Sequence, residues 1–369
     1  MPKTTETVLE IDLTALGKNY HYLKSRIKDT TKLLGVVKAF AYGSDAVIIA
    51  KELEALGVDY LAVAYVNEGV ILRDVGIKTP ILVLHPQPEN FETLIDRCLE
   101  PSLYNESVLK QFIKIASEKK QLNYPVHLKF NTGLNRLGFN EAEVDKIISE
   151  LNATSTIKIT SLFSHLAASE DLTEKYFSQS QISTFKNIAK NISSKLSYQP
   201  KLHMSNTSGI LNYPEAQFDM VRSGIGLYGF SNIPEEQKNF IPIATLKSVI
   251  SQIHTIKKGD SVGYNRAFKS KGTIVTATIP IGHADGISRA YGNGKGWVMV
   301  QGIKAPIIGN VCMDMMMVNI TGIVCKEGDE VIVFGGNNKA DLLAESIESI
   351  SYELLTAISQ RVKREVCRK

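Results

Sequence analysis

The first two-thirds of this chain alternates short apolar or β-branched runs with stretches whose apolar residues recur at helical spacing. Strands that alternate with helices favour a parallel sheet with helical crossovers. Eight runs can be counted: Leu33–Val37, Tyr60–Ala64, Ile81–Leu84, Pro101–Tyr104, Pro125–Phe130, Ile157–Phe163, Lys201–Met204 and Phe218–Arg222. Eight strands close a (β/α)8 TIM barrel, which we therefore expect; an open doubly wound sheet is the alternative.

Two segments show helical spacing most clearly. In residues 105–118 and 173–192, apolar side chains recur every three or four positions, which places them on one face of an amphipathic helix. These faces comprise Val108, Phe112, Ile115 and Ala116, and then Tyr176, Phe177, Ile182, Phe185, Ile188 and Ala189. Asn105 is a suitable N-cap for the first helix.

The alternation ends near residues 231–242, where Pro234 and Pro242 flank a charged stretch that indicates a linker. The β-rich runs beyond it are separated by glycine-containing turns and one helical segment at 341–358. They cover residues 245–256, 273–281, 297–300, 303–308, 315–320 and 330–334. We expect a barrel domain in residues 1–235 and a mostly antiparallel β domain in residues 236–369.

Charge and composition exclude several classes of protein. A net charge of +4 on 369 residues is too weak to indicate a nucleic-acid partner, and a basic C-terminal end is typical of a solvated strand or tail. Neither a membrane span nor a secretory signal is expected, because no apolar run approaches ~18 residues. The four cysteines lack metal-like spacing, so we expect no metal site, and reduced thiols in the cytoplasm.

Polar residues follow the predicted strands where barrel enzymes carry their reactive groups, at the C-terminal strand ends. In chain order they are Lys38, Lys129, Arg136, His165, His203, Asn206, Thr207 and Arg222, and Gly224 and Ile225 follow the last strand. A single lysine after a strand is more often a surface cation, and a single histidine is more often a hydrogen-bonded structural residue. Their clustering is what indicates an active site.

One motif needs a separate interpretation. Residues 224–229 have the spacing G-x-G-x-x-G after a predicted strand. A dinucleotide-binding motif must open a helix and meet an acidic residue about 20 positions later. Here Pro234 and the predicted linker follow instead. These glycines are better suited to letting backbone N–H groups approach a phosphate.

With these residues in place, the sequence closely resembles bacterial alanine racemases, which are barrel-type pyridoxal-phosphate enzymes. The resemblance covers essentially the whole chain in order. The matching segments are residues 37–39, 41–43, 129–133, 136–138, 164–165, 203 with 206, 221–222, 224–225, 262–264, 281–286, 309–314 and 352–353. The resemblance implies a TIM barrel followed by a β domain that the first residues, about ten of them, also join.

The resemblance also implies roles for single residues. Lys38 would carry pyridoxal phosphate as an aldimine and serve as the base on the D face, while Tyr264 would serve on the L face. His165, next to Arg222, would stand behind the Tyr264 phenol, and Arg222 would face the pyridine nitrogen. The other implied residues are Arg136 and Met313 for the substrate carboxylate, Tyr42, His203, Asn206, Thr207, Gly224, Ile225 and Tyr352 for the cofactor, and Lys129 as a candidate for carbamylation.

The activity that the resemblance implies is interconversion of L- and D-alanine by two-base proton transfer at Cα, which supplies D-alanine for peptidoglycan. It further implies a homodimer in which Tyr264 and Met313 complete the partner's site. Departures from the family pattern occur at Phe40, Ser44-Asp45, Thr207, His283 and Asn310. They leave the acid–base residues intact but leave substrate size open.

Four alternatives therefore remain. The first is a broad-specificity racemase of small amino acids, such as alanine and serine. The second is another barrel-type enzyme, a decarboxylase or a D-amino-acid dehydratase. The third is a non-catalytic pyridoxal-phosphate carrier, although such proteins resemble the barrel alone. The fourth is a purely structural barrel.

Overall fold

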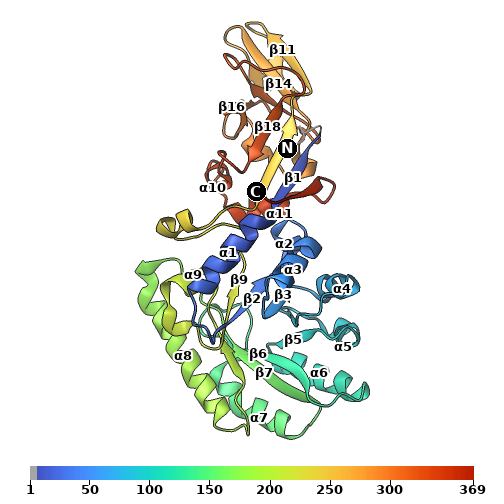
Figure 1. The fold of residues 1–369 in the computed structure, drawn as a ribbon, viewed down its shortest axis with the longest axis vertical. Helices are drawn as coiled ribbons and strands as arrows, with labels where there is room; N and C mark the ends of the chain where they lie inside the picture. Colours follow the sequence, from blue (N-terminus) through green and yellow to red (C-terminus); the bar gives the residue numbers. More distant parts are fainter. Residues whose placement is uncertain (1–5) are drawn as a thin grey trace. The chain divides into compact units, whose positions relative to one another are not determined.

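The computed structural model describes residues 6–369, which form two compact units (Figure 1). One unit, here called the barrel unit, comprises Gly17–Ala41 and Ala46–Ile241. The other, the β unit, comprises the chain up to Leu16 together with Tyr42–Asp45 and Pro242–Lys369. The N-terminal stretch expected in the β domain includes residues 1–5, which lie outside the described range.

The barrel unit holds a closed barrel of eight parallel strands in chain order. They are β2 (Lys32–Val36), β3 (Tyr60–Val63), β4 (Ile81–Val83), β5 (Glu100–Leu103), β6 (Tyr124–Lys129), β7 (Ile157–Phe163), β8 (Lys201–His203) and β9 (Met220–Ser223). Pairing of Leu34 in β2 with Arg222 in β9 closes the ring. The predicted barrel is confirmed, and each of the eight predicted runs overlaps one strand.

Side chains fill the inside of the barrel and helices cover its outside, so its strands are buried on both faces. All four residues of β3 and all four of β9 are buried. The α-helices are α1 (Leu13–Ser25), α2 (Lys38–Tyr42), α3 (Ala46–Ala55), α4 (Val66–Asp74), α5 (Phe91–Asp96), α6 (Glu106–Glu118), α7 (Val144–Asn152), α8 (Lys175–Ser193) and α9 (Thr207–Asn212). Short 3₁₀ turns span Pro88–Asn90, Glu141–Glu143, Leu172–Glu174, Pro214–Ala216 and Pro234–Asn239. No helix within residues 6–369 combines the length and the apolar character that a membrane crossing requires.

The two predicted helices differ in outcome. The Asn105 side chain accepts a hydrogen bond of 2.8 Å from the Val108 N–H, so the predicted N-cap of α6 is confirmed. The predicted buried face of α8 is wrong in its first turn, where Tyr176 is 87% and Phe177 is 40% exposed. Burial begins at Ser178, whose hydroxyl donates to the Ala168 carbonyl at 3.4 Å.

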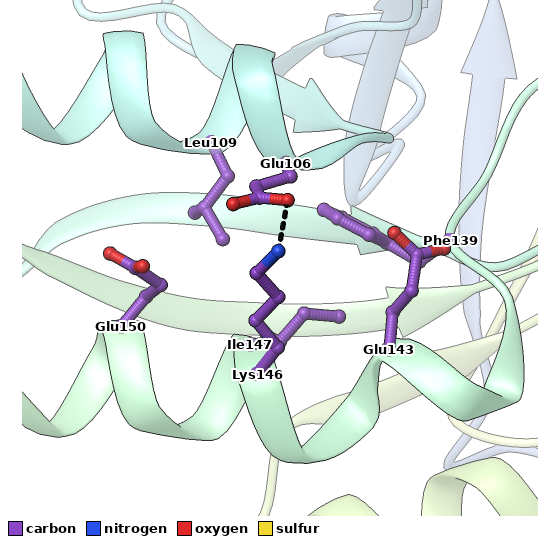
Figure 2. Close-up of a pocket in the computed structure, with 7 residues that line it drawn as sticks. All are labelled: Glu106, Leu109, Phe139, Glu143, Lys146, Ile147 and Glu150. Carbon is purple, nitrogen blue, oxygen red and sulfur yellow. Dashed lines mark hydrogen bonds and ion pairs between the residues drawn. The ribbon is translucent and has the colours of Figure 1, made fainter.

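Helices α6 and α7 show how the outer layer packs. Lys146 of α7 is paired with Glu106 of α6, above an apolar contact that includes Leu109, Phe139 and Ile147 (Figure 2). The gap between these side chains has a volume of about 10 Å³. A ligand site needs a few hundred Å³ or more, so this gap is a packing defect and not a binding site.

The β unit is built on a nine-stranded sheet in the order β11-β14-β17-β16-β15-β18-β10-β1-β19. Its strands are β1 (Val8–Asp12), β10 (Ala244–Val249), β11 (Gln252–Ile256), β14 (Ile274–Ile279), β15 (Trp297–Val300), β16 (Ile303–Ile308), β17 (Met316–Asn319), β18 (Glu330–Phe334) and β19 (Lys363–Cys367). Burial alternates along β10 and β17, as expected for a sheet with one solvated face. The pairings are antiparallel except for β1 with β19.

The remaining elements of the β unit are short. They are the hairpin of β12 (Ser261–Val262) and β13 (Phe268–Lys269), the 3₁₀ turns Tyr264–Arg266, His283–Asp285 and Arg289–Tyr291, and the helices α10 (Ala340–Glu345) and α11 (Ser351–Ala357). Two predicted segments are divided in the structure. The run 245–256 becomes β10 and β11, which lie in different parts of the sheet, and the helical segment 341–358 breaks where Glu348 has a φ of 60°.

Replacing the buried Asn19 of α1 should destabilise the barrel unit. Its amide donates to the carbonyls of Leu227 (3.1 Å) and Ile241 (2.8 Å) and accepts from the Ile241 N–H (2.9 Å). Asn19→Ala leaves these buried groups unpaired, and we expect the thermal unfolding midpoint to fall by roughly 5–10 °C. The exposed neighbour His21, changed to alanine, is the control and should shift it by under about 2 °C. Equal shifts would contradict the assigned role of Asn19.

Candidate active site

The buried Arg222 guanidinium lies at the C-terminal end of β9 and is 5% exposed. It donates to His203 Nδ1 (2.5 Å), to His165 Nδ1 (3.1 Å) and to two backbone carbonyls, those of Ser164 (2.7 Å) and Met204 (3.0 Å). Burial, and then the nearby charge of Arg136, lowers the pKa of Arg222 to about 9. The group therefore stays positively charged at neutral pH.

Both histidines beside Arg222 are neutral. Burial, followed by the charge of Arg222, holds the pKa of His165 and that of His203 well below their usual values. A guanidinium can only donate hydrogen bonds, so the Nδ1 atoms that face Arg222 must accept. Each neutral ring then carries its proton on Nε2. For His165 this leaves an N–H available for a further partner.

Two lysines add positive charge to the same strand ends. Lys129, the last residue of β6, is 7% exposed, and its Nζ lies 5.9 Å from the centre of the Phe163 ring. Burial, then the charge of Arg136, lowers the pKa of Lys129 to about 8. Burial and Arg136 also lower the pKa of Lys38, while Glu68 opposes the shift. Both amines therefore lose a proton more readily than surface lysines.

The backbone after Lys38 is unusual. Four consecutive non-glycine residues, Ala39 to Tyr42, have φ values between 51° and 55°. This left-handed turn is disfavoured for residues with a Cβ, at roughly 1–2 kcal/mol per residue. Strain of this kind clusters at active sites and persists only where the surrounding structure maintains it. The turn is independent support for a functional role of the lysine that precedes it.

The loop after β9 and the start of α9 form a cradle of small residues. The Thr207 hydroxyl lies 3.1 Å from the Ser223 hydroxyl and accepts from the Gly226 N–H (3.3 Å). A Cβ added at Gly226 would lie 2.6 Å from the Thr207 methyl, so glycine is required for this close approach. Asn206 caps α9 by accepting from the Gly209 N–H at 2.8 Å.

These residues suit a cofactor that carries a phosphate. The strand ends gather the cations Lys38, Lys129, Arg136 and Arg222, each of which appears among the charges that shift its neighbours. Positive charge gathered in this way is stabilised by an anionic ligand, and the small-residue cradle leaves backbone N–H groups open to close approach. The donor set therefore fits a phosphorylated aldehyde held on an amine.

The remaining predicted residues belong to the β unit. The rings of Tyr42 and Tyr352 lie 6.0 Å apart, and burial raises the pKa of Tyr42, so its hydroxyl remains a donor. Tyr264 is 73% and Met313 is 59% exposed. The Asn310 side chain donates to the Tyr264 carbonyl at 3.3 Å. The candidate residues therefore fall into two groups. One group lies in the barrel unit and the other lies in the β unit.

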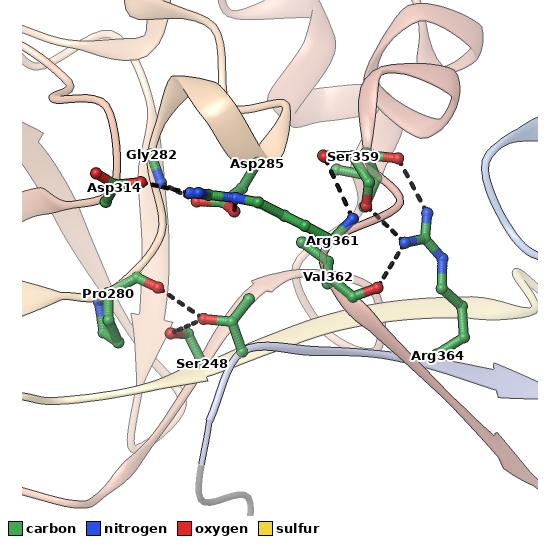
Figure 3. Close-up of polar contacts among 11 residues, drawn as sticks. Ser248, Pro280, Gly282, Asp285, Asp314, Ser359, Arg361, Val362 and Arg364 are labelled. Carbon is green, nitrogen blue, oxygen red and sulfur yellow. Dashed lines mark hydrogen bonds and ion pairs between the residues drawn. The ribbon is translucent and has the colours of Figure 1, made fainter.

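A network of charges and backbone bonds holds the loop that carries Met313. Arg361 donates to Asp285 (2.7 Å) and to Asp314 (2.6 Å), the neighbour of Met313 (Figure 3). The His283 and Ala284 N–H groups donate to the Cys312 and Met313 carbonyls, at 2.9 and 3.0 Å. The two loops are therefore joined through side chains and backbone, which fixes the direction of the Met313 N–H.

Three polar residues inside the barrel escaped prediction: Glu100, His127 and Ser161. His127 and Ser161 are fully buried and hydrogen-bonded to each other at 2.6 Å. A signal was present, since His127 precedes the predicted Lys129 by two positions. Alternate residues of a strand face the same side, so a lysine that points inward implies an inward histidine as well.

Lys129 should titrate near pH 8. In protein labelled with ¹³C at lysine Cε and kept in CO₂-free buffer, NMR should show its transition at about 8. Lys110, whose pKa is raised by hydrogen bonds to Glu106 and Glu150, is the internal control and should titrate above its usual value. A Lys129 transition at pH 10 or above would contradict the expected environment.

The same shift has a consequence for stability. The folded chain releases the Lys129 proton near pH 8, whereas the unfolded chain keeps it to about 10.5. Between these values the unfolded state binds more protons, so this lysine by itself makes the free energy of unfolding rise with pH.

Comparison with known proteins covers both units. The family model "Alanine racemase, N-terminal domain" matches residues 11–232, and "Alanine racemase, C-terminal domain" matches residues 243–366. The alanine racemase of Thermodesulfovibrio yellowstonii is 35% identical over 365 residues, which are 96% of each chain. The alanine racemase of Sorangium cellulosum is 34% identical, over 97% of this chain and 98% of its own.

Solved structures agree with these sequence matches. An alanine racemase structure from Clostridium difficile 630 superposes with a TM-score of 0.93 at 34% identity, covering 99% of this chain and 97% of that one. The Bartonella henselae alanine racemase, described with covalently bound pyridoxal phosphate, superposes with a TM-score of 0.89 at 28% identity. That comparison covers 99% of this chain and 100% of the Bartonella chain.

Proposed function

Because this chain belongs to the alanine racemase family, we propose that it interconverts L- and D-alanine with pyridoxal phosphate as cofactor. The observation that supports this most directly is the buried Arg222 guanidinium, which keeps its charge while two neutral imidazoles accept from it. A guanidinium cannot give a proton to a pyridine nitrogen at neutral pH. A neutral ring nitrogen makes a weaker electron sink, which favours reprotonation at Cα over transamination.

Lys38 is the proposed attachment point and one of the two bases. When bound, pyridoxal phosphate supplies an electron sink for the Cα carbanion. Burial and the charge of Arg136 favour the neutral Lys38 amine, which can form the covalent link and later accept or return a proton at Nζ. The strained turn that follows holds this amine at the end of β2.

Tyr264 is the proposed second base, and it acts in the partner's site of a homodimer. Its 73% exposure leaves the phenol accessible to a second copy of the chain. His165 carries its proton on Nε2, because its Nδ1 accepts from Arg222. That N–H is suited to donate to a phenolate oxygen and so to stabilise the charged form of the base.

The other candidate residues bind and orient the substrate and the cofactor. Arg136 and the Met313 N–H of the partner hold the substrate carboxylate, by charge and by a backbone hydrogen bond. Tyr42, Thr207, Gly224, Ile225 and Tyr352 hold the phosphate; His203 and Asn206 support the residues beside it. Carbamylation of Lys129 needs a neutral amine, and its pKa of about 8 supplies a substantial fraction of one at neutral pH.

Serine is a second candidate substrate. His283 is exposed at the surface of the β unit, and Asn310 donates to the Tyr264 carbonyl, where the family commonly has a tyrosine and an arginine. Asn310 therefore alters the polar groups beside the second base. The cell would use the D-alanine product for peptidoglycan, which agrees with a cytoplasmic location.

Incubation in deuterated water tests the activity and the substrate range. With L-alanine, we expect D-alanine to appear with deuterium at Cα, since racemisation must exchange that proton with solvent. With L-serine, exchange should be slower by roughly tenfold or more if the site is fitted to a methyl group. Both are read by chiral chromatography and mass spectrometry. Absence of exchange with either amino acid would overturn the proposed function.

Tyr264→Phe tests the two-base arrangement. Racemisation should fall roughly 10²–10⁴-fold, because one face of Cα then has no acid or base. Deuterium exchange into D-alanine with retention should persist, since Lys38 serves that face. Tyr176→Phe, at a tyrosine that is 87% exposed on the barrel unit, is the matched control and should leave both rates unchanged. Unchanged racemisation in Tyr264→Phe would remove this residue from the mechanism.

A further inference from the structure

A continuous hydrogen-bonded chain crosses the interior of the barrel and ends at Arg222. It takes one residue from each of five consecutive strands, β5 to β9; β5, β6, β7 and β9 are labelled in Figure 1. In order, its members are Glu100, His127, Ser161, His203 and Arg222. The successive distances are 2.7, 2.6, 2.8 and 2.5 Å. The three middle members are fully buried.

The direction of every bond in this chain can be followed from its Arg222 end, and both ends of the chain favour the same direction. Arg222 can only donate, so His203 accepts through Nδ1 and carries its single proton on Nε2. His203 Nε2–H must then donate to the Ser161 hydroxyl oxygen. The Ser161 O–H is left to donate to His127 Nδ1, and His127 donates through Nε2–H to Glu100. His127 is therefore a neutral Nε2–H tautomer, and its contact with Glu100 is a hydrogen bond and not an ion pair.

The Glu100 end favours the same direction, since its carboxylate lies 2.7 Å from His127 Nε2. An ionised carboxylate can only accept, and Glu100 also accepts from the Tyr60 hydroxyl at 3.4 Å. The chain thus runs from a group that can only donate to a group that can only accept. If His127 carried its proton on Nδ1, the order of donors would reverse, and a His203 N–H would face an Arg222 N–H.

We propose that Glu100 is a positioning residue for Arg222, although it lies at the opposite end of the hydrogen-bonded chain. Its carboxylate holds His127 as the Nε2–H tautomer, and through Ser161 it holds His203 in the same form. The Nδ1 lone pair of His203 is thereby kept toward the guanidinium. The importance of Arg222 for racemisation rests on the proposed function, whereas the tautomers do not.

Burial explains why a remote residue can matter here. The three middle members are fully buried, so reversing one bond leaves two donors facing each other at a high cost. The stacking of His203 on Phe163, with ring centres 4.8 Å apart and an angle of 2°, holds the plane of the imidazole.

The first experiment reads the tautomers directly. Full-length protein is labelled with ¹⁵N-histidine, and two-bond ¹H–¹⁵N correlation spectra are recorded at neutral pH. Signals are assigned by their loss in His127→Asn and His203→Asn. We expect both imidazoles to be neutral with the proton on Nε2. An Nδ1–H tautomer or a doubly protonated ring at either position would overturn the proposal, and this result needs no catalytic activity.

The second experiment changes the accepting end. Glu100→Gln preserves size but offers both a donor and an acceptor, and Glu100→Leu offers neither. We expect kcat to fall roughly threefold in the first and roughly tenfold or more in the second, with KM changed less than about twofold, since Arg136 and not the chain binds the carboxylate. The His127 signal should shift toward a mixture of tautomers in both variants.

Glu54→Gln is the matched control. Glu54 is also a half-buried carboxylate of the barrel unit, and it accepts from the N–H groups of Lys78 and Thr79 at 2.7 Å, away from the chain. It should change neither the histidine spectra nor kcat. Wild-type tautomers in Glu100→Leu would overturn the proposal even if this variant lost activity. If wild-type protein shows the expected tautomers but no racemisation, the proposed function fails while the positioning role stands.

Discussion

Burial of a charged guanidinium inside the barrel is the constraint on which the rest of the site depends. An isolated charge in this setting would be costly by many kcal/mol, so each of its donors needs an acceptor. Arg222 finds these acceptors on β8 and in the segments that follow β7 and β8. None of its four acceptors is a carboxylate. The positive charge is consequently left to act on its surroundings, where it keeps two imidazoles neutral and contributes to the lowered pKa of Lys129.

The fold was largely predictable because its barrel strands are short, mostly apolar and separated by helices. Runs such as Tyr60–Val63 have no polar position that could be confused with a turn. Prediction failed where the local sequence pattern does not show which distant segments of the chain pack against a residue. The first turn of α8 carries Tyr176 and Phe177 at the correct spacing, yet Tyr176 is 87% and Phe177 is 40% exposed. Likewise, residues 245–256 look like one strand in the sequence. The local sequence does not show that β10 and β11 occupy different positions in the sheet.

The candidate site was likewise predictable only in part. Residues at strand ends could be found from the barrel pattern, since topology alone brings strand ends together. The roles of Lys38 and Tyr264 as the two bases came from the resemblance to alanine racemases, because no sequence spacing relates these two residues. Glu100 and Ser161 were missed for a different reason. Glu100 lies just before the predicted run 101–104, and Ser161 follows another hydroxyl residue, Thr160. The partner of each lies on a neighbouring strand that is remote in sequence.

The hydrogen-bonded chain across the barrel has a consequence for how this interior can change over time. Each middle member must both donate and accept, so a single replacement leaves a neighbour on either side unmatched. An apolar interior could replace the whole set at once, but not one member at a time. Drift in these five strands should therefore be slow and concerted, while the outer helices remain free to diverge residue by residue.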